Sequence, residues 1–463
     1  MPRPGQRAIS PREPAGLFVV LMSLSWLIPA GILAAGLLSW LDLFLALSLL
    51  VVLYDTLQAA GILLLARSGL QRLRSSAGAV AAAAAPTIAV VIPAWNEAAS
   101  LGATLESVLA QSPQPSEVIV CDDGSSDDGS SDDTLVRLAE GYGLGGQGRL
   151  RRSSSHPSLQ LLTKEHGGKG DSINQGVAIS TAEVVLILDA DTELLPGALA
   201  ALEHRFALEP GLDAVSGTLL PRCPANLQGR LFAGFQRYEY ARNHLWRLAW
   251  SQWDATLIIS GACSAFRRQT LLDIGGFDPS SWVEDYEIIY RLQRHRRDRG
   301  EPCRVRVEPA LTVRTEAPGR MGVFLRQRRR WAGGFLETLI RYRPMVGNRR
   351  YGVLGLLYLS HNTYTVASFL YPLAWFLAGL ALLARPPASG LGGLGLLALI
   401  SALVGLLLTG LSLEVYRRAF GRSEVSVPGA LIELSLRPFF YIPLNLISHL
   451  WGYASSLSRR RSW

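Results

Sequence analysis

Cysteine is scarce in this chain, and the few cysteines that occur exclude two classes of protein. Only four cysteines stand among 463 residues, and no two of them form a CxxC pair. This pattern excludes a small disulfide-stabilised scaffold and a zinc domain built on paired cysteines. The seven histidines also lack the spacing of zinc ligands. We expect free thiols in a reducing compartment at Cys121, Cys223, Cys263 and Cys303.

Signatures of nucleotide loops and nucleic-acid modules are missing as well. The chain has no GxxxxGK[ST] loop and no GxGxxG loop at a strand-to-helix junction, which argues against a P-loop or dinucleotide enzyme. Its net charge of +8 has no accompanying zinc-finger spacing, helix-turn-helix or aromatic-basic patch, so we expect no nucleic-acid partner. The positive charge fits a protein that lies against anionic lipid and handles anionic substrates.

Charged residues are absent from several long apolar runs. Hydrophobic residues make up 49% of the chain, and the mean hydropathy is +0.22. A helix of ~20 apolar residues is long enough to cross a bilayer. The run at 43–66 has one charged residue, Asp55. We predict transmembrane helices at about residues 15–38, 43–66, 364–384 and 389–413.

The composition divides the chain into membrane regions around one polar, globular stretch. Prolines at 438 and 443 break the last apolar stretch, 431–453, so we expect it to be interfacial or re-entrant. The predicted parts are an N-terminal membrane region at 1–70, a linker at 71–86, a soluble domain at 87–317, interfacial helices at 318–350 and a C-terminal membrane region at 351–463.

Arginines flank both ends of the first helical pair. The first run is too long for a signal-peptide core and has no small-residue cleavage pattern, so we expect a retained anchor. Positive residues at both ends place the soluble domain in the cytoplasm. We therefore expect a multi-pass protein of the cell (inner) membrane. The flanking residues are Arg3, Arg7, Arg12, Arg67, Arg72 and Arg74.

In the polar stretch, short apolar runs alternate with helical patterns. We predict buried strands at 87–92, 117–121, 159–163 and 184–188, and helices at 98–111 and 169–179. This alternation predicts a Rossmann-like α/β domain with a mostly parallel sheet covered on both faces. Ligands of such sheets bind at the carboxyl ends of the strands.

Two acidic motifs stand directly after predicted strands: Asp122-Asp123-Gly124 and Asp189-Ala190-Asp191. Carboxylates one residue apart can hold a hard divalent cation together with phosphate oxygens of a substrate. The alternative for each motif alone is an acidic turn or a helix N-cap. Two such motifs on neighbouring strand ends favour the ligand site.

A third motif places Gln327, Arg330 and Trp331 on one face of a predicted helix, at i, i+3 and i+4. An amide, a permanent cation and a flat aromatic surface suit an anionic leaving group beside a sugar ring. The alternative is a solvated, arginine-rich helix lying on a membrane surface.

Six motifs follow one another along the chain: Pro93 to Glu97, Asp122 to Gly124, Gly168-Lys169 with Asn174, Asp189 to Asp191, Glu284-Asp285 and Gln327 to Trp331. In this order they resemble the motifs of the processive family 2 glycosyltransferases, the membrane-embedded synthases that include cellulose, hyaluronan and poly-N-acetylglucosamine synthases. The resemblance implies a GT-A-type fold with a mixed, mostly parallel sheet, embedded between transmembrane helices. Two features depart from the family: a tandem Gly-Ser-Ser-Asp-Asp repeat at 124–133, and Asp171, where the family more often has a small residue.

The resemblance implies a UDP-sugar donor and assigns residues to it. Asp122 would contact the uracil and ribose, with Asp123 supporting it, and Lys169 would face the diphosphate. Asp189 and Asp191 would hold Mg²⁺ or Mn²⁺, Asp191 as the more direct ligand. The further substrate-binding residues that the motifs imply are Pro93, Asn96 and Glu97.

The acceptor side follows from the same resemblance. Asp285, next to Glu284, would be the general base that takes the proton from the acceptor hydroxyl. Arg330 would stabilise the departing UDP. One base without a nucleophilic carboxylate implies direct displacement with inversion, although a helix N-cap also explains the acidic pair. Ser260 and Gly261 would lie in the acceptor corridor, and Trp331 would stack on the acceptor sugar. Gln327 is a further substrate-binding residue that the motif implies.

The expected function is transfer of a hexose or N-acetylhexosamine from a UDP-sugar to a growing β-linked polysaccharide, with export coupled to synthesis. Two alternatives stay open: a glycolipid synthase with a lipid acceptor, and a non-catalytic scaffold for polymer export. The lipid bilayer is an expected partner in all three, and export or regulatory subunits are compatible with each.

Overall fold

The computed structural model of the chain describes residues 16–38, 40–76, 84–125, 133–145, 148–384, 390–421, 429, 435–437 and 439–458. Most of the tandem acidic repeat, and Arg3, Arg7 and Arg12, lie outside these residues. The chain forms two compact units, which are described separately. The sheet unit comprises Gln71–Gln236 and Asp254–Pro318, and the helical unit comprises Ile9–Leu70, Arg237–Trp253 and Gly319–Trp463.

Nine strands of the described residues form one sheet in the order β3-β4-β2-β1-β5-β8-β7-β9-β6. The block β4-β2-β1-β5 is parallel throughout, whereas β8 runs antiparallel to both β5 and β7. The strands are β1 Ile88–Ala94, β2 Glu117–Asp122, β3 Leu150–Arg152, β4 Leu159–Thr163, β5 Val184–Leu188, β6 Thr192–Leu194, β7 Ala214–Arg222, β8 Cys263–Arg267 and β9 Val305–Glu316.

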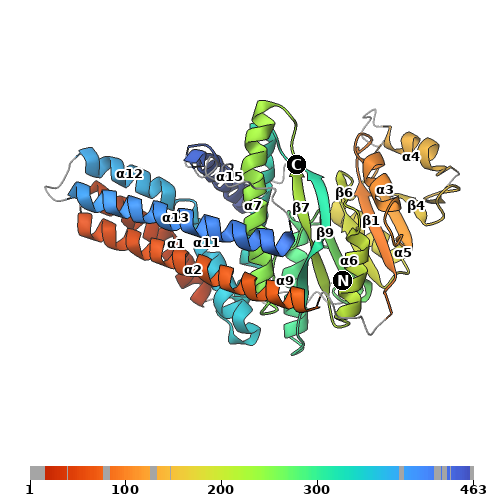
Figure 1. Cartoon of the computed structure of the whole chain (residues 1–463), viewed down its shortest axis with the longest axis horizontal. Coiled ribbons are helices and arrows are strands. Elements are labelled where there is room, and N and C mark those ends of the chain that lie inside the picture. The colour runs from red at the N-terminus through yellow and green to blue at the C-terminus, as the bar shows by residue number, and fades with distance from the viewer. Residues whose placement is uncertain are drawn as a thin grey trace. The chain divides into compact units, whose positions relative to one another are not determined.

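The predicted strands and helices of the parallel block are present. Strands predicted at 159–163 and 184–188 coincide with β4 and β5, and the helix predicted at 169–179 coincides with α5. The helices that lie wholly within the sheet unit are α3 Leu101–Leu109, α4 Thr134–Tyr142, α5 Lys169–Ile179, α6 Ala198–Leu208, α8 Arg268–Asp273 and α9 Glu284–Arg297. The long helix α7, Leu227–Ser251, begins in the sheet unit and ends in the helical unit (Figure 1).

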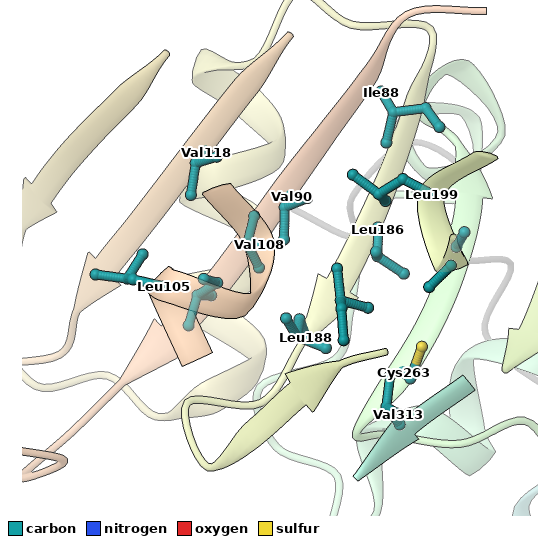
Figure 2. Close-up of a cluster of buried hydrophobic side chains, with 14 of the residues drawn as sticks. Ile88, Val90, Leu105, Val108, Val118, Leu186, Leu188, Leu199, Cys263 and Val313 are labelled. Carbon is teal, nitrogen blue, oxygen red and sulfur yellow. The ribbon is translucent and has the colours of Figure 1, made fainter. Parts of the chain in front are cut away.

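Alternate residues of the parallel strands enter two different cores. Val90, Val118 and Leu186 pack with Leu105 and Val108 of α3 on one face (Figure 2). The other face packs against α5, α8 and α9 through a separate buried cluster. Because both faces are covered, these strands are apolar along their whole length, which explains why they were recognisable in the sequence.

The helical unit contains the apolar runs. Helices α1, α2 and α12 share a buried cluster that includes Ile32, Phe44 and Ala378 (Figure 1). Gly36 allows close approach of two of these helices, since a Cβ there would lie 2.3 Å from the Ala378 Cβ. The helices are α1 Gly16–Leu37, α2 Leu41–Ser76, α10 Met321–Arg341, α11 Leu359–Ser368, α12 Tyr371–Ala384, α13 Gly390–Phe420 and α15 Tyr441–Leu457.

Three helices of the described residues are long and apolar enough to cross a membrane, and a bent pair makes a fourth candidate. The predicted span at about 364–384 falls in a bent pair of helices, Leu354–Ser368 and Tyr371–Leu382, which turns by 45° and is a candidate for one broken span. Pro372, the second residue of the second helix, has no backbone N–H to donate to the first helix. Helix α2 also continues through Ser76, so the first residues of the predicted linker are helical. The boundaries of the membrane regions otherwise stay predictions.

Candidate active site

The carboxyl ends of the parallel strands bring the sequence-predicted acidic motifs to one edge of the sheet. Ala94 of β1 pairs with Asp122 of β2, and Asp122 pairs in turn with Thr163 of β4. Asp189 directly follows β5, the other neighbour of β1. Four adjacent strand ends therefore supply side chains to one region, as expected for a ligand site of such a sheet.

Asp122 is buried and is tied to the loop after β1. Its carboxylate accepts a hydrogen bond from the Ser125 hydroxyl, which itself accepts one from the backbone N–H of Asn96, 3.1 Å away. Asn96 has a φ of 57°, in the left-handed region where asparagine is favoured among the non-glycine residues. Burial raises the pKa of Asp122, and hydrogen bonds from Ser125 and Gly124 oppose this rise. Pro93 is buried inside β1.

Asp123 fixes the loop that follows β4. Its carboxylate accepts hydrogen bonds from the backbone N–H groups of Gly167, at 2.9 Å, and Gly168, at 2.8 Å, and it pairs with the Lys164 ammonium. Burial raises the pKa of Asp123, but these partners outweigh burial and hold the pKa below its ordinary value. The role that the structure supports for Asp123 is thus to shape the loop that leads to Lys169.

Lys164 is a site residue that the sequence analysis missed. Its side chain is only 2% exposed, and its ammonium lies 3.0 Å from the Asp171 carboxylate in addition to its contact with Asp123. Asp171 was noted as a departure from the family pattern, and this ion pair accounts for it. The available signal was a lysine immediately after a predicted buried strand, where an unpaired charge would be costly.

Lys169 connects the end of β5 with the start of α9. Its Nζ lies 2.5 Å from Asp189 Oδ1 and 3.4 Å from Glu284 Oε1, and it donates to the Gly261 carbonyl at 3.3 Å. Burial alone would lower the pKa of Lys169, but Asp189, Glu284 and Asp285 raise it above its ordinary value. The lysine is therefore a permanent cation between two sequence-predicted acidic motifs.

Asp191 and Glu97 add negative charge to the same region. Asp191 Oδ1 accepts hydrogen bonds from the hydroxyls of Thr192, at 3.0 Å, and Thr315, at 3.4 Å. Burial raises the pKa of Asp191, and Glu316 adds to the rise. Burial also raises the pKa of Glu97, and the neighbouring Asp191 and Asp189 raise it further. Raised pKa values mark carboxylates that a nearby cation would stabilise.

The donor set at this point fits a cation shared with a substrate better than a closed protein site. No group of three or more His, Cys, Asp or Glu side chains within the described ranges is arranged to hold a metal ion. Mg²⁺ sites of substrate diphosphates use one or two carboxylates and leave the other positions to phosphate oxygens and water. Asp189 and Asp191 supply such a pair.

Asp285 lies at the beginning of α9, against the backbone of Gly261. A Cβ built on Gly261 would lie 2.7 Å from Asp285 Oδ2, so only glycine leaves room for this carboxylate. Asp285 Oδ1 also accepts from the backbone N–H of Tyr286 at 3.0 Å. The neighbouring Ser260 is buried, and its hydroxyl accepts from the Ala262 N–H at 3.3 Å. The predicted base therefore lies against Gly261, one of the residues predicted for the acceptor.

Asn174 holds the turn that precedes α9. Its amide oxygen accepts from the Phe277 N–H at 2.7 Å, and its amide nitrogen donates to the Phe277 carbonyl at 2.8 Å. Gly276, which directly precedes Phe277, has a φ of 71°, and a Cβ on it would collide with the Asn174 side chain. This motif residue acts on the backbone that leads to Glu284 and Asp285.

Gln327, Arg330 and Trp331 lie on α10, in the helical unit, and are described within that unit alone. Gln327 Oε1 is buried and has no hydrogen-bond donor in the described part of the chain. The Arg328 guanidinium lies 4.1 Å from the centre of the Trp331 ring. The predicted i, i+3 and i+4 spacing on a helix is confirmed by α10.

Known proteins are similar to this chain over about half of its length. The model of a family described as "Glycosyltransferase like family 2" matches residues 85–334, which include every sequence-predicted site residue. Poly-β-1,6-N-acetyl-D-glucosamine synthases of Staphylococcus aureus strain COL and Staphylococcus epidermidis are 27% and 28% identical over 256 residues. Each match covers 55% of this chain and 56% of the relative, so the chain spans about half the length of these curated relatives.

A solved structure resembles the chain over a longer stretch. A mannosyltransferase from Pyrobaculum calidifontis, solved with GDP-mannose and Mn²⁺, covers 87% of this chain and 99% of its own, with a TM-score of 0.51 and 20% identity. At this identity the similarity concerns the fold. The predicted fold class, a GT-A-type α/β domain with a mixed sheet and flanking apolar helices, is confirmed.

Proposed function

The chain is a member of glycosyltransferase family 2, and from this premise we propose that it transfers a hexose or N-acetylhexosamine from a UDP-sugar to a growing β-linked polysaccharide. The observation that carries the proposal is the position of Lys169, 2.5 Å from Asp189 and 3.4 Å from Glu284. One cation thus lies between the motif proposed for the diphosphate and the motif proposed for the acceptor.

The proposed reaction is a single displacement. Asp285 takes the proton from the acceptor hydroxyl, whose oxygen forms a bond to the anomeric carbon while the bond between that carbon and the UDP oxygen breaks. Attack opposite the leaving group inverts the configuration and yields a β linkage from an α-linked donor. Lys169 compensates negative charge that develops on UDP. From the motif alone we add Arg330 at the leaving group and Trp331 and Gln327 at the acceptor.

Mg²⁺ or Mn²⁺ completes the proposed donor site. Asp191 and Asp189 are the residues that would hold the ion, which when bound supplies Lewis-acid stabilisation of the diphosphate. The raised pKa of Asp191, caused by burial and by Glu316, supports a cation there. Asp122 would bind the nucleoside, and Asp123, Asn96, Glu97 and Pro93 would shape its loops.

We place the protein in the inner membrane as a multi-pass protein with its sheet unit in the cytoplasm. The three candidate spans and the bent pair support membrane insertion. Basic residues at the end of the second candidate span, Arg67 and Arg72, support the orientation. Fusion of a periplasmic-only reporter after residue 76 should give no signal, and a cytoplasmic reporter at that position should be active.

UDP release by the purified protein in lipid nanodiscs tests the proposed reaction. We expect Mn²⁺- or Mg²⁺-dependent release with one sugar nucleotide, with UDP-N-acetylglucosamine tested first because of the relatives' names, together with high-molecular-weight glycan. Asp285→Asn should abolish release and keep UDP binding, whereas the exposed Asp273→Asn should keep both. Nucleotide release only with GDP-mannose would overturn the proposal that the donor is a UDP-sugar. Release only after lipid addition would favour a glycolipid synthase, and no release with any donor would favour the export scaffold.

A further inference from the structure

Arg328, the first of the three arginines between Gln327 and Trp331, is the most deeply buried arginine of this helix. Its side chain is 4% exposed, whereas Arg326, one half-turn earlier, is exposed. The guanidinium carbon lies 4.9 Å from the centre of the Phe324 ring and 4.1 Å from the centre of the Trp331 ring. These rings come from the preceding and following turns of α10, so the guanidinium sits between them.

Two other helices of the helical unit hold this guanidinium in place. The Arg328 guanidinium donates through Nη1 and Nη2 to the two carboxylate oxygens of Glu239 on α7, at 2.6 and 2.8 Å. Tyr441, at the start of α15, donates its hydroxyl to the same Glu239 carboxylate. The Tyr441 ring also packs on Phe324, with ring centres 5.5 Å apart. A fork-shaped guanidinium on a carboxylate leaves little rotational freedom, which a lysine would retain.

From this arrangement we propose that Arg328 and Glu239 are positioning residues that orient the Trp331 indole for the acceptor sugar. The inference rests on the proposed function, in which Trp331 contacts the acceptor. The guanidinium fixes the ring through a cation–π contact, and Glu239 fixes the guanidinium. An orientated ring binds a sugar with less loss of side-chain freedom than a ring that must be ordered on binding. Neither residue touches the reacting atoms.

A purely structural role for the pair makes a different prediction. Breaking a buried ion pair can lower the stability of the whole unit, which reduces the active fraction without changing any Michaelis constant. A role through Trp331 instead changes the affinity for the acceptor and leaves the donor unaffected. It also disappears when the indole is already replaced, because the two residues then no longer act together.

The test is a double-mutant cycle between Arg328→Lys and Trp331→Phe in nanodiscs, with Arg326→Lys as the matched control on the exposed side of α10. Initial rates are measured with the donor that the wild type uses and with a soluble β-linked oligosaccharide of the same sugar as acceptor. We expect Arg328→Lys to raise the acceptor KM about tenfold and the donor KM less than about twofold. In the Trp331→Phe background the same change should add less than about twofold.

Glu239→Gln and Tyr441→Phe give a second route if Arg328→Lys yields no folded protein. Glu239→Gln should raise the acceptor KM in the same direction, and Tyr441→Phe, which loses one hydroxyl and keeps its ring, should raise it less. Additive effects of Arg328→Lys and Trp331→Phe would overturn the inference, as would equal changes in donor and acceptor KM. A wild type that releases UDP from no sugar nucleotide would instead overturn the proposed function.

Discussion

Asp285 occupies the space that a side chain on Gly261 would need. The carboxylate oxygen Oδ2 lies 2.7 Å from the position of a Cβ on Gly261, and the Asp285 Cγ lies 3.1 Å from it. The contact joins the loop before β8 to the first turn of α9, two segments that are distant in the chain. The Asp285 carboxylate can occupy this position only because residue 261 has no side chain. A substitution of Gly261 should therefore displace it.

Gly261→Ala should displace the Asp285 carboxylate while keeping every proposed functional group. A shift of about 1 Å in a reacting group can reduce turnover about 100-fold, so we expect a loss of this order in UDP release. Gly102→Ala is the control, because nothing lies within 4 Å of a Cβ on that helical glycine. Wild-type turnover of Gly261→Ala would contradict the proposed position of the base.

Lys164 should contribute strongly to the stability of the sheet unit. Lys164→Met leaves the Asp123 carboxylate, which is 4% exposed, without its buried cation. Removing one partner of a buried ion pair costs about 3–5 kcal/mol. We expect a clear fall in the thermal unfolding midpoint measured by intrinsic fluorescence, and partial recovery when Asp171→Ala is added. The exposed Arg137→Met is the control and should change stability little. A Lys164→Met protein as stable as the wild type would refute this account of the loop.

Binding of Mn²⁺ should be measurable without any turnover. Burial raises the pKa values of Asp189 and Asp191 in the folded protein. A carboxyl group with a raised folded pKa favours folding below its unfolded pKa, and this contribution is lost as the pH rises through the folded pKa. At a pH above these raised pKa values the ionised pair therefore disfavours folding, and a bound cation offsets that effect.

The expected outcome is a rise in the unfolding midpoint when Mn²⁺ and UDP are added at neutral pH. The rise should shrink as the pH falls through the raised pKa values, because protons then compete with the ion. Asp191→Asn should abolish the metal-dependent part of the shift, and Asp273→Asn should keep it. An unchanged shift in Asp191→Asn would remove that residue from the proposed metal site.

The sequence predicted the parallel half of the sheet well and the site only in part. Strands buried on both faces are continuous apolar runs, so β4 and β5 were found with their correct bounds. The strands β7, β8 and β9 of the mixed half of the sheet were not predicted, because their pairing depends on contacts distant in sequence. Motif residues such as Asp189 stand beside strand ends and were visible. Lys164 and Arg328 were overlooked because their importance comes from burial, which a charged residue does not reveal in a sequence.

Asn174 was recognised as a motif residue, but the sequence did not reveal that its side chain binds the backbone. Its amide makes both of its hydrogen bonds to Phe277, and no aliphatic side chain can replace them. Net losses of about 1 kcal/mol for each hydrogen bond should loosen the turn before α9. We therefore expect Asn174→Ala to lower the unfolding midpoint modestly and to reduce turnover through a misplaced Asp285.

Isothermal titration with UDP and single-turnover kinetics separate these effects. UDP affinity should stay within about twofold of wild type, while the rate of sugar transfer falls about tenfold, corresponding to 1.4 kcal/mol. Gln269→Ala is the control, because its amide bonds only the exposed Asp273 side chain, at 2.8 Å. If Asn174→Ala instead weakens UDP binding and leaves the transfer rate unchanged, the asparagine acts on the donor site and the turn does not position the base.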